Sequence, residues 1–153
     1  MQIAWKHLNK RAAALDALKD YGSMQFILEH ADDDIRVEHE KMESVCSPSF
    51  DGMPHVHNPQ AGEKRILNGI KEIDVLKERY RQALEYMVWF QLAWDELTKD
   101  EQFVLREFYM CDEAQQIDVV YNICDYFHIE RSSAYNKKNR ALDRLSTLLY
   151  GKR

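Results

Sequence analysis

The chain has 153 residues, a formal net charge of -5 at pH 7 and 45% hydrophobic residues, which suits one domain or one domain with an appendage. Its 5 glycines and 3 prolines are too few for the many turns of a β fold, so the composition predicts an all-α protein. Three cysteines without a CxxC pair indicate a reduced, cytoplasmic protein. The early charges and polar alternation of MQIAWKHLNKRAAAL argue against a secretory signal or a spanning helix, so we expect no membrane partner.

Residues 1–62 form the first predicted segment, with two helices and a loop. The first helix, over 4–20, has apolar residues three or four apart, and Gly22 is its predicted end. A second helix is predicted over 24–45, with Ser23 as its N-cap. Within it, residues 29–43 carry seven acidic and two basic side chains, which favours a solvated face. All three prolines lie in 47–62, which is typical of a loop.

Histidines in and near this loop raise the question of a metal site. His55 and His57 lie close in sequence to Cys46 and His39, but their spacing matches no established zinc pattern. The sequence therefore predicts neither a metal site nor a cofactor.

Residues 63–97 form the second segment, a long helix with a heptad pattern. Apolar residues recur at steps of four and three through Gly69, Ile73, Leu76, Tyr80, Ala83, Met87, Phe90, Trp94 and Leu97. A single helix cannot bury such a seam alone. The seam packs either on the helices of residues 4–45 or on the same helix of a second subunit, which would make the protein a homo-oligomer.

Residues 98–153 form the third segment, a compact helical domain. Thr98 to Glu101 (TKDE) matches the S/T-x-x-E capping box, so a helix is expected to begin at 98, with Phe103, Val104, Phe108 and Tyr109 on its apolar side. After a polar connector over 111–116, a short helix is predicted to run to Phe127. A tight break over 128–130 then separates it from a final helix, RSSAYNKKNRALDRLSTLLYG.

The final helix concentrates the positive charge of the chain. Residues 129–153 hold seven basic and two acidic residues, a formal charge of +5, which leaves -10 on residues 1–128. At 100° per residue, Ala134, Tyr135, Ala141, Leu142, Leu145 and Leu149 share one arc, and Ser132, Ser133, Asn136, Lys137, Arg140 and Arg144 share the opposite arc. We interpret that polar arc as free of acids. Its groups donate hydrogen bonds to phosphates and to base edges of the major groove.

A short helix, a tight turn and a basic helix are the layout of a helix-turn-helix. Residues 97–150 resemble region 4 of bacterial sigma factors, with LTKDEQFVLREFY as the supporting helix and IERSSAYNKKNRALDRL as the recognition helix. The whole chain is similar to the ArpU-like, sigma-like late-gene regulators of phages and prophages of Gram-positive bacteria, through DGMP, GIKEIDVLKERY and RALDRLSTLLYG. The chain departs from the sigma pattern at His128, Glu130 and Lys138.

This resemblance implies a transcriptional regulator of late phage or prophage genes in the bacterial cytoplasm, with RNA polymerase as a further partner. The sequence itself predicts binding to double-stranded DNA. Ser132, Ser133, Asn136, Lys137 and Arg140 would face the groove, and Arg131 and Arg144 would contact phosphates.

Two other functions stay open. The same parts would suit the small subunit of a phage DNA-packaging terminase, or a protein-interaction adaptor without DNA binding. Catalysis is not expected, because the sequence has no GxSxG, P-loop, HExxH or DxDxDG motif.

Overall fold

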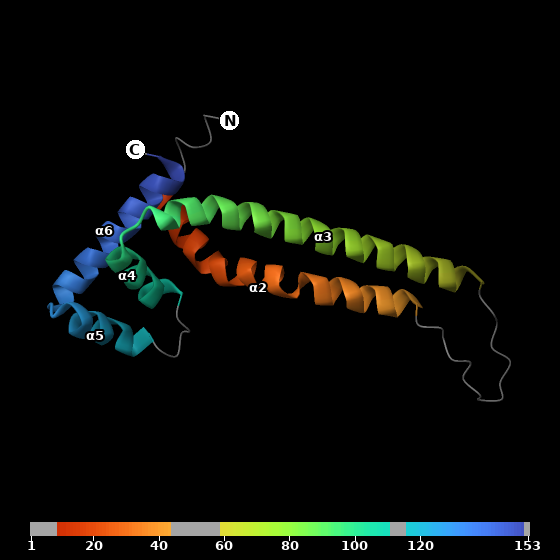
Figure 1. Ribbon diagram of the computed structural model, residues 1–153, viewed down its shortest axis with the longest axis horizontal. Helices are drawn as coiled ribbons and strands as arrows, with labels where there is room; N and C mark the ends of the chain where they lie inside the picture. Colours follow the sequence, from red (N-terminus) through yellow and green to blue (C-terminus); the bar gives the residue numbers. More distant parts are fainter. Residues whose placement is uncertain (1–8, 44–58, 111–115, 152–153) are drawn as a thin grey trace. The chain divides into compact units, whose positions relative to one another are not determined.

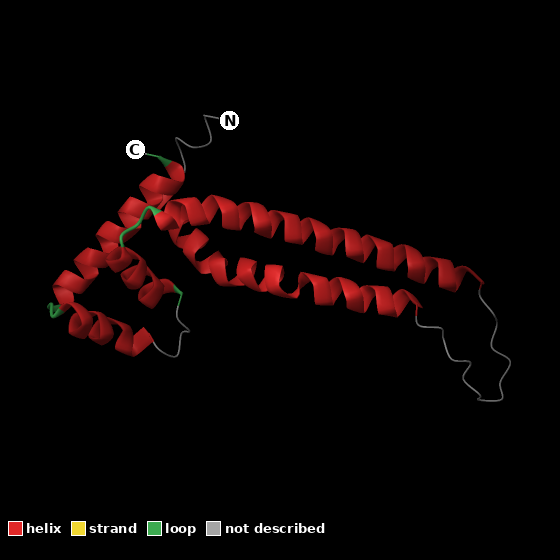
Figure 2. Ribbon diagram, in the orientation of Figure 1, coloured by secondary structure: helices red, strands yellow, loops and turns green. Residues whose placement is uncertain are grey.

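The computed structural model describes residues 9–43, 59–110 and 116–151. These residues form five α-helices and no strand, as Figures 1 and 2 show, so the predicted all-α class is confirmed. The helices are α2 (Lys10–Glu43), α3 (Pro59–Asp95), α4 (Lys99–Tyr109), α5 (Gln116–Phe127) and α6 (Arg131–Tyr150). None of these helices is long and apolar enough to cross a membrane.

The described chain divides into two compact units. Unit 1 comprises the residues up to Gln25 and those from Glu85 onward, and unit 2 comprises Phe26–Leu84. Each unit contains one stretch of both long helices, and within each unit the stretches of α2 and α3 run antiparallel, side by side (Figure 1).

The main core of unit 1 joins α2 and α3 to α4 and α6. The small Ala14 and Ala17 of α2 allow large side chains to pack closely on this helix. Together with Leu18 they lie in the same buried cluster as Phe90 and Trp94 of α3 and Leu97, which follows α3. Leu105 of α4 and Ala141, Leu142, Leu145 and Leu149 of α6 complete the cluster. The Tyr86 hydroxyl donates to the Ala17 carbonyl, and the Tyr150 hydroxyl donates to the Ala13 carbonyl at 3.3 Å. The first of these bonds joins α3 to α2, and the second joins the end of α6 to α2.

A second cluster in unit 1 holds α4, α5 and α6 together. Val104 of α4, Val119 and Ile123 of α5 and Ala134 of α6 are buried in it. The three helices contact one another pairwise, so each helix buries its apolar side against the other two.

Unit 2 has a thinner interior. Among its described residues, the buried hydrophobic ones are Ala31, Ile73 and Ala83, all of them on the two long helices. Gly69 of α3 lies against the Met42 side chain of α2, where an added Cβ would overlap it, and Arg65 donates to the Met42 carbonyl at 3.5 Å. A larger residue at 69 would therefore have to displace the Met42 side chain.

The heptad seam of α3 is largely buried, and the first of its two predicted partners is the one observed. Gly69, Ile73, Ala83, Phe90, Trp94 and Leu97 are buried, and seam residues of both units pack on α2 of the same chain. Tyr80 departs from the seam, because 39% of its surface is exposed.

The predicted break at Gly22 is wrong. Gly22 lies in the interior of α2, which continues without interruption to Glu43. Glycine lowers helix propensity by about 1 kcal/mol relative to alanine, a cost too small to end a helix that is packed on both sides of that position. The predicted helix start near residue 4, Cys46, His55 and His57 lie outside the described residues.

Candidate nucleic-acid interface

The position of α6 is fixed at its middle by a polar network with the start of α4. Thr98 and Glu101 form the predicted capping box: the Thr98 amide donates to Glu101 Oε2 at 2.9 Å, and the Glu101 amide donates to Thr98 Oγ1 at 3.3 Å. Gln102 Nε2 donates to the Trp94 carbonyl at 2.7 Å, which joins α4 to the end of α3. Backbone groups that a helix end leaves without partners are thus satisfied here.

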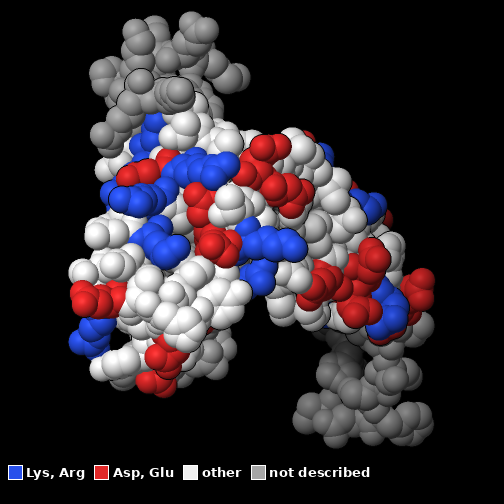
Figure 3. Space-filling model, turned by 60° about the vertical axis from the view of Figure 1, so that its left-hand side comes forward, with Lys and Arg blue, Asp and Glu red and all other residues white. Residues whose placement is uncertain are grey.

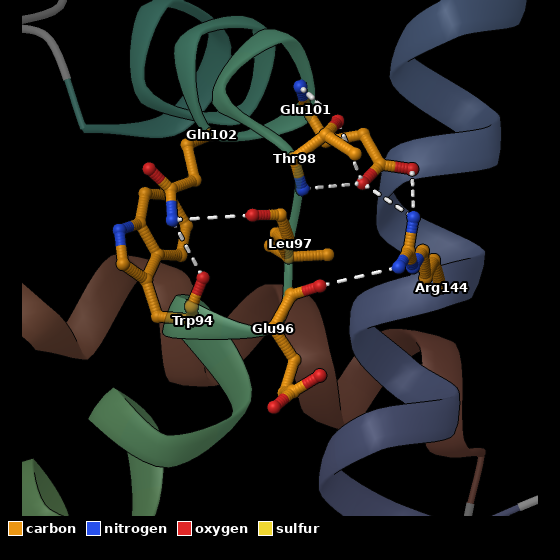
Figure 4. A network of polar contacts seen from close by, with 7 residues as sticks. All are labelled: Trp94, Glu96, Leu97, Thr98, Glu101, Gln102 and Arg144. Atoms are coloured by element: carbon orange, nitrogen blue, oxygen red, sulfur yellow. Dashed lines mark hydrogen bonds and ion pairs between the residues drawn. The ribbon is translucent and has the colours of Figure 1, made fainter.

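Arg144 completes this network from α6. Its Nη1 donates to both Glu101 carboxylate oxygens, at 3.0 and 3.3 Å, and its Nη2 donates to the Glu96 carbonyl at 3.2 Å (Figure 4). The Arg144 side chain is 47% exposed. Its guanidinium is directed toward α4, and the expected phosphate contact of this residue stays a prediction.

The turn before α6 is tight because His128 adopts a left-handed conformation, with φ at 53°. The Ile129 amide donates to the Cys124 carbonyl at 3.0 Å, and both residues pack at the second cluster. A left-handed residue followed by a bond back to the last turn is the Schellman arrangement, which usually has glycine where His128 stands. Glu130 then caps α6 in an extended conformation without a hydrogen bond from its side chain.

Three of the predicted groove residues lie on the outer side of α6. Ser132, Asn136 and Arg140 are exposed and follow one another at steps of four, so they form one row along the helix. Ser133 and Lys137 are half-buried beside this row. The opposite side, with Ala134, Ala141, Leu142, Leu145 and Leu149, is buried as predicted.

Two predicted cations at the start of α6 lie against aromatic rings of α5. Arg131 Nη2 donates to the Tyr121 hydroxyl at 2.7 Å, and its guanidinium carbon lies 4.7 Å from the centre of that ring. Lys137 Nζ lies 4.3 Å from the centre of the Phe127 ring. These cation–π contacts restrict the rotamers of both side chains while their charges stay available to solvent.

The interpretation of the polar arc as free of acids is wrong. Asp143 lies two turns after Asn136, on the same side of α6, and its side chain is 60% exposed. Arg11 of α2 compensates this charge: its Nη1 lies 3.4 Å from Asp143 Oδ1, and its Nη2 donates to Asn139 Oδ1 at 2.6 Å. Sequence reasoning missed Arg11, because nothing in the pattern of α2 connects it with a residue more than 120 positions later.

Lys138 lies in the middle of the apolar arc of α6, and Tyr135 lies at the edge of that arc. The Lys138 ammonium lies 5.1 Å from the centre of the Phe108 ring and 5.2 Å from that of Tyr135. Burial lowers the pKa of Lys138, and repulsion from Arg11 lowers it further. Tyr135 was expected in the buried arc but is 46% exposed, which corrects that assignment.

Acidic groups also lie beside the cations of α6. Asp100 and Glu101 line one groove together with Lys137 and Arg140. On the face shown in Figure 3, basic and acidic side chains are interspersed, and neither sign covers a large continuous area. Contacts of this face with DNA would therefore depend on individual side chains more than on a broad positive field.

The described residues include no group of three or more histidine, cysteine or acidic side chains that could hold a metal ion. No protein-family model, curated protein or solved structure matches the chain.

Proposed function

We propose that the protein is a sequence-specific DNA-binding transcriptional regulator in which α5 and α6 act as a helix-turn-helix. The observation that carries this proposal is the exposed row of Ser132, Asn136 and Arg140 on a helix that follows a tight left-handed turn. In a helix-turn-helix, the second helix enters the major groove with its N-terminal residues against the bases.

The chemistry of this row suits base recognition. An asparagine amide can bind N6 and N7 of adenine, an arginine guanidinium can bind O6 and N7 of guanine, and serine hydroxyls bind either base or phosphate. Ser133 lies beside the row, and Arg131 and Lys137 flank it with positive charge for the backbone phosphates. Arg11 is paired with Asp143 and Asn139, so it offsets the negative charge of Asp143 beside the row.

The resemblance to ArpU-like and sigma-like regulators supports late phage or prophage genes as the regulated genes. It also supports RNA polymerase as a partner.

Acidic groups near the row would repel a DNA backbone: Glu130 at the start of α6, Asp143 two turns after Asn136, and Asp100 beside Lys137 and Arg140. The interface therefore requires the row of specific contacts for its affinity.

The test measures binding of the full chain to a duplex selected by the protein itself from a randomised pool. Asn136→Ala and Arg140→Ala are each expected to weaken binding by about 1–3 kcal/mol and to relax the base preference at one position. Lys137→Ala is expected to weaken binding to all duplexes alike and to reduce the salt slope by about 1.

Arg79→Ala is the matched control, since Arg79 is an exposed arginine of α3 in unit 2. Equal retention of the duplex by wild type, Asn136→Ala, Arg140→Ala and the control would contradict the proposal.

A further inference from the structure

Helix α3 carries a second heptad stripe in unit 2, distinct from the seam that packs on α2. Its members follow one another at steps of three and four: Leu67, Ile70, Asp74, Lys77, Arg81 and Leu84. All six side chains are exposed, and the apolar ones are exposed by 56% at Leu67, 47% at Ile70 and 46% at Leu84. The stripe is thus apolar at both ends and charged in its middle.

We propose that this stripe pairs with the same stripe of a second copy of the chain, with the two α3 helices antiparallel. Heptad stripes of this kind associate side by side, and exposed leucine and isoleucine side chains on one helix side gain free energy when they are removed from water. A twofold axis relates the two copies, so each contact between unlike positions occurs twice.

The charges decide the orientation of the two helices. In a parallel pair, equal positions meet, so Asp74, Lys77 and Arg81 would each face a like charge. In an antiparallel pair with the axis between residues 75 and 76, Asp74 faces Lys77 of the partner subunit, and Leu67 faces Leu84 of the partner subunit. Opposite charges then meet at the layer of Asp74 and Lys77, and apolar side chains meet at the layer of Leu67 and Leu84.

The remaining layer of this register places Ile70 against Arg81 of the partner subunit. The Arg81 guanidinium is bound to Glu78 of its own helix, with Nε 2.9 Å from Oε2 and Nη2 2.6 Å from Oε1. Its aliphatic stem therefore remains to cover Ile70, as arginine stems do at helix–helix contacts. Shifting the register by one heptad toward the end of α3 would place Lys77 against Arg81 of the partner subunit, which disfavours that alternative.

The test uses the full chain and follows its oligomeric state by sedimentation over a range of protein concentrations. Wild type is expected to dimerise. Asp74→Lys places lysine against lysine at both symmetric layers, and Lys77→Asp places aspartate against aspartate, so each is expected to weaken the dimer about tenfold or more. Circular dichroism checks that both variants remain helical.

The double variant Asp74→Lys/Lys77→Asp distinguishes an antiparallel pair of helices from a parallel one. It restores opposite charges in the antiparallel pair and is expected to recover most of the lost association, whereas a parallel pair would gain nothing from it. A wild type that stays monomeric at all concentrations, as expected if the stripe binds a different protein, would overturn the proposal. Single variants that dimerise as well as wild type, or a double variant that stays as weak as the single ones, would overturn it as well. DNA binding by α6 is not needed for any of these outcomes.

Discussion

At the scale of single residues, the turn before α6 depends on an uncommon conformation of His128. A non-glycine residue with φ at 53° is less stable than glycine there, because its Cβ approaches the following carbonyl. We expect His128→Gly to raise the free energy of unfolding by up to about 1 kcal/mol and His128→Val, whose branched Cβ tolerates this region poorly, to lower it by about 1–2 kcal/mol. Urea denaturation of the full chain measures both.

A lower stability of His128→Gly than of wild type would mean that the histidine side chain makes a compensating contact. DNA binding serves as the control in this series. Neither substitution alters the side chains of Ser132, Asn136 or Arg140. At equal folded fraction, the affinity for DNA should therefore change only if the substitution moves α6.

Arg144 offers a choice between a structural and a DNA-binding role. Arg144→Met keeps much of the aliphatic stem and removes the bonds to Glu101 and Glu96, so we expect it to destabilise the protein by roughly 1 kcal/mol, as for a partly exposed pair. Glu101→Gln is the matched variant. If the contact is structural, the two losses are not additive in a double-mutant cycle.

The salt slope of DNA binding distinguishes the two roles of Arg144. A residue that contacts phosphate lowers the slope by about 1 when its charge is removed, whereas a residue that only holds α4 against α6 leaves it unchanged. The phosphate contact predicted from the sequence would give a reduced slope for Arg144→Met. An unchanged slope would show that Arg144 only holds α4 against α6.

At the scale of whole elements, the effect of Gly22 on the stability of α2 can be measured by substitution. Gly22 is exposed in the interior of α2, and an added Cβ would meet nothing within 4 Å. We expect Gly22→Ala to raise the free energy of unfolding by about 0.5–1 kcal/mol, because alanine restricts the unfolded chain and has the better helix propensity.

Gly22→Pro is the opposite variant, and we expect it to destabilise the protein by about 3 kcal/mol or more. Thermal unfolding followed by circular dichroism measures both. If Gly22→Pro is tolerated, the helix does break near this residue, as the sequence pattern indicates.

Local patterns predicted the elements of this chain well where one feature decides them. The capping box of Thr98 and Glu101, the apolar stripe of α6 and the heptad seam of α3 all have a periodicity or spacing that needs no tertiary context. Gly22 was misjudged because its effect depends on packing along the rest of α2. Leu105 was not assigned to the apolar side of α4, although it is fully buried, because α4 packs on two sides at once.

The candidate site was predicted less completely than the fold. Ser132, Asn136 and Arg140 follow from the period of α6 alone. The contacts of Arg11 with Asn139 and Asp143, and of Arg144 with Glu101, join segments that are distant in sequence. No pattern in a single sequence predicts such pairs. The structure was therefore needed to find which charged side chains of α6 have a partner of opposite charge.

At the scale of the whole molecule, the two units differ in how much apolar surface they bury. Unit 1 buries large side chains such as Phe90, Trp94 and Leu145, each of which contributes about 1.5–3 kcal/mol when removed from water. Among the described residues of unit 2, the buried hydrophobic ones are Ala31, Ile73 and Ala83. Local opening is therefore expected to cost less free energy in unit 2 than in unit 1.

Hydrogen exchange followed by mass spectrometry tests this difference. At low protein concentration, we expect the amides of residues 26–43 and 59–84 to exchange faster than those around Phe90 and Leu145. Since association through the second stripe of α3 removes water from residues 67–84, their exchange should slow as the protein concentration rises, by mass action. Asp74→Lys should abolish this concentration dependence while leaving the exchange of unit 1 unchanged. Equal protection of both units would contradict the uneven burial, and protection independent of concentration would contradict the pairing of two α3 helices.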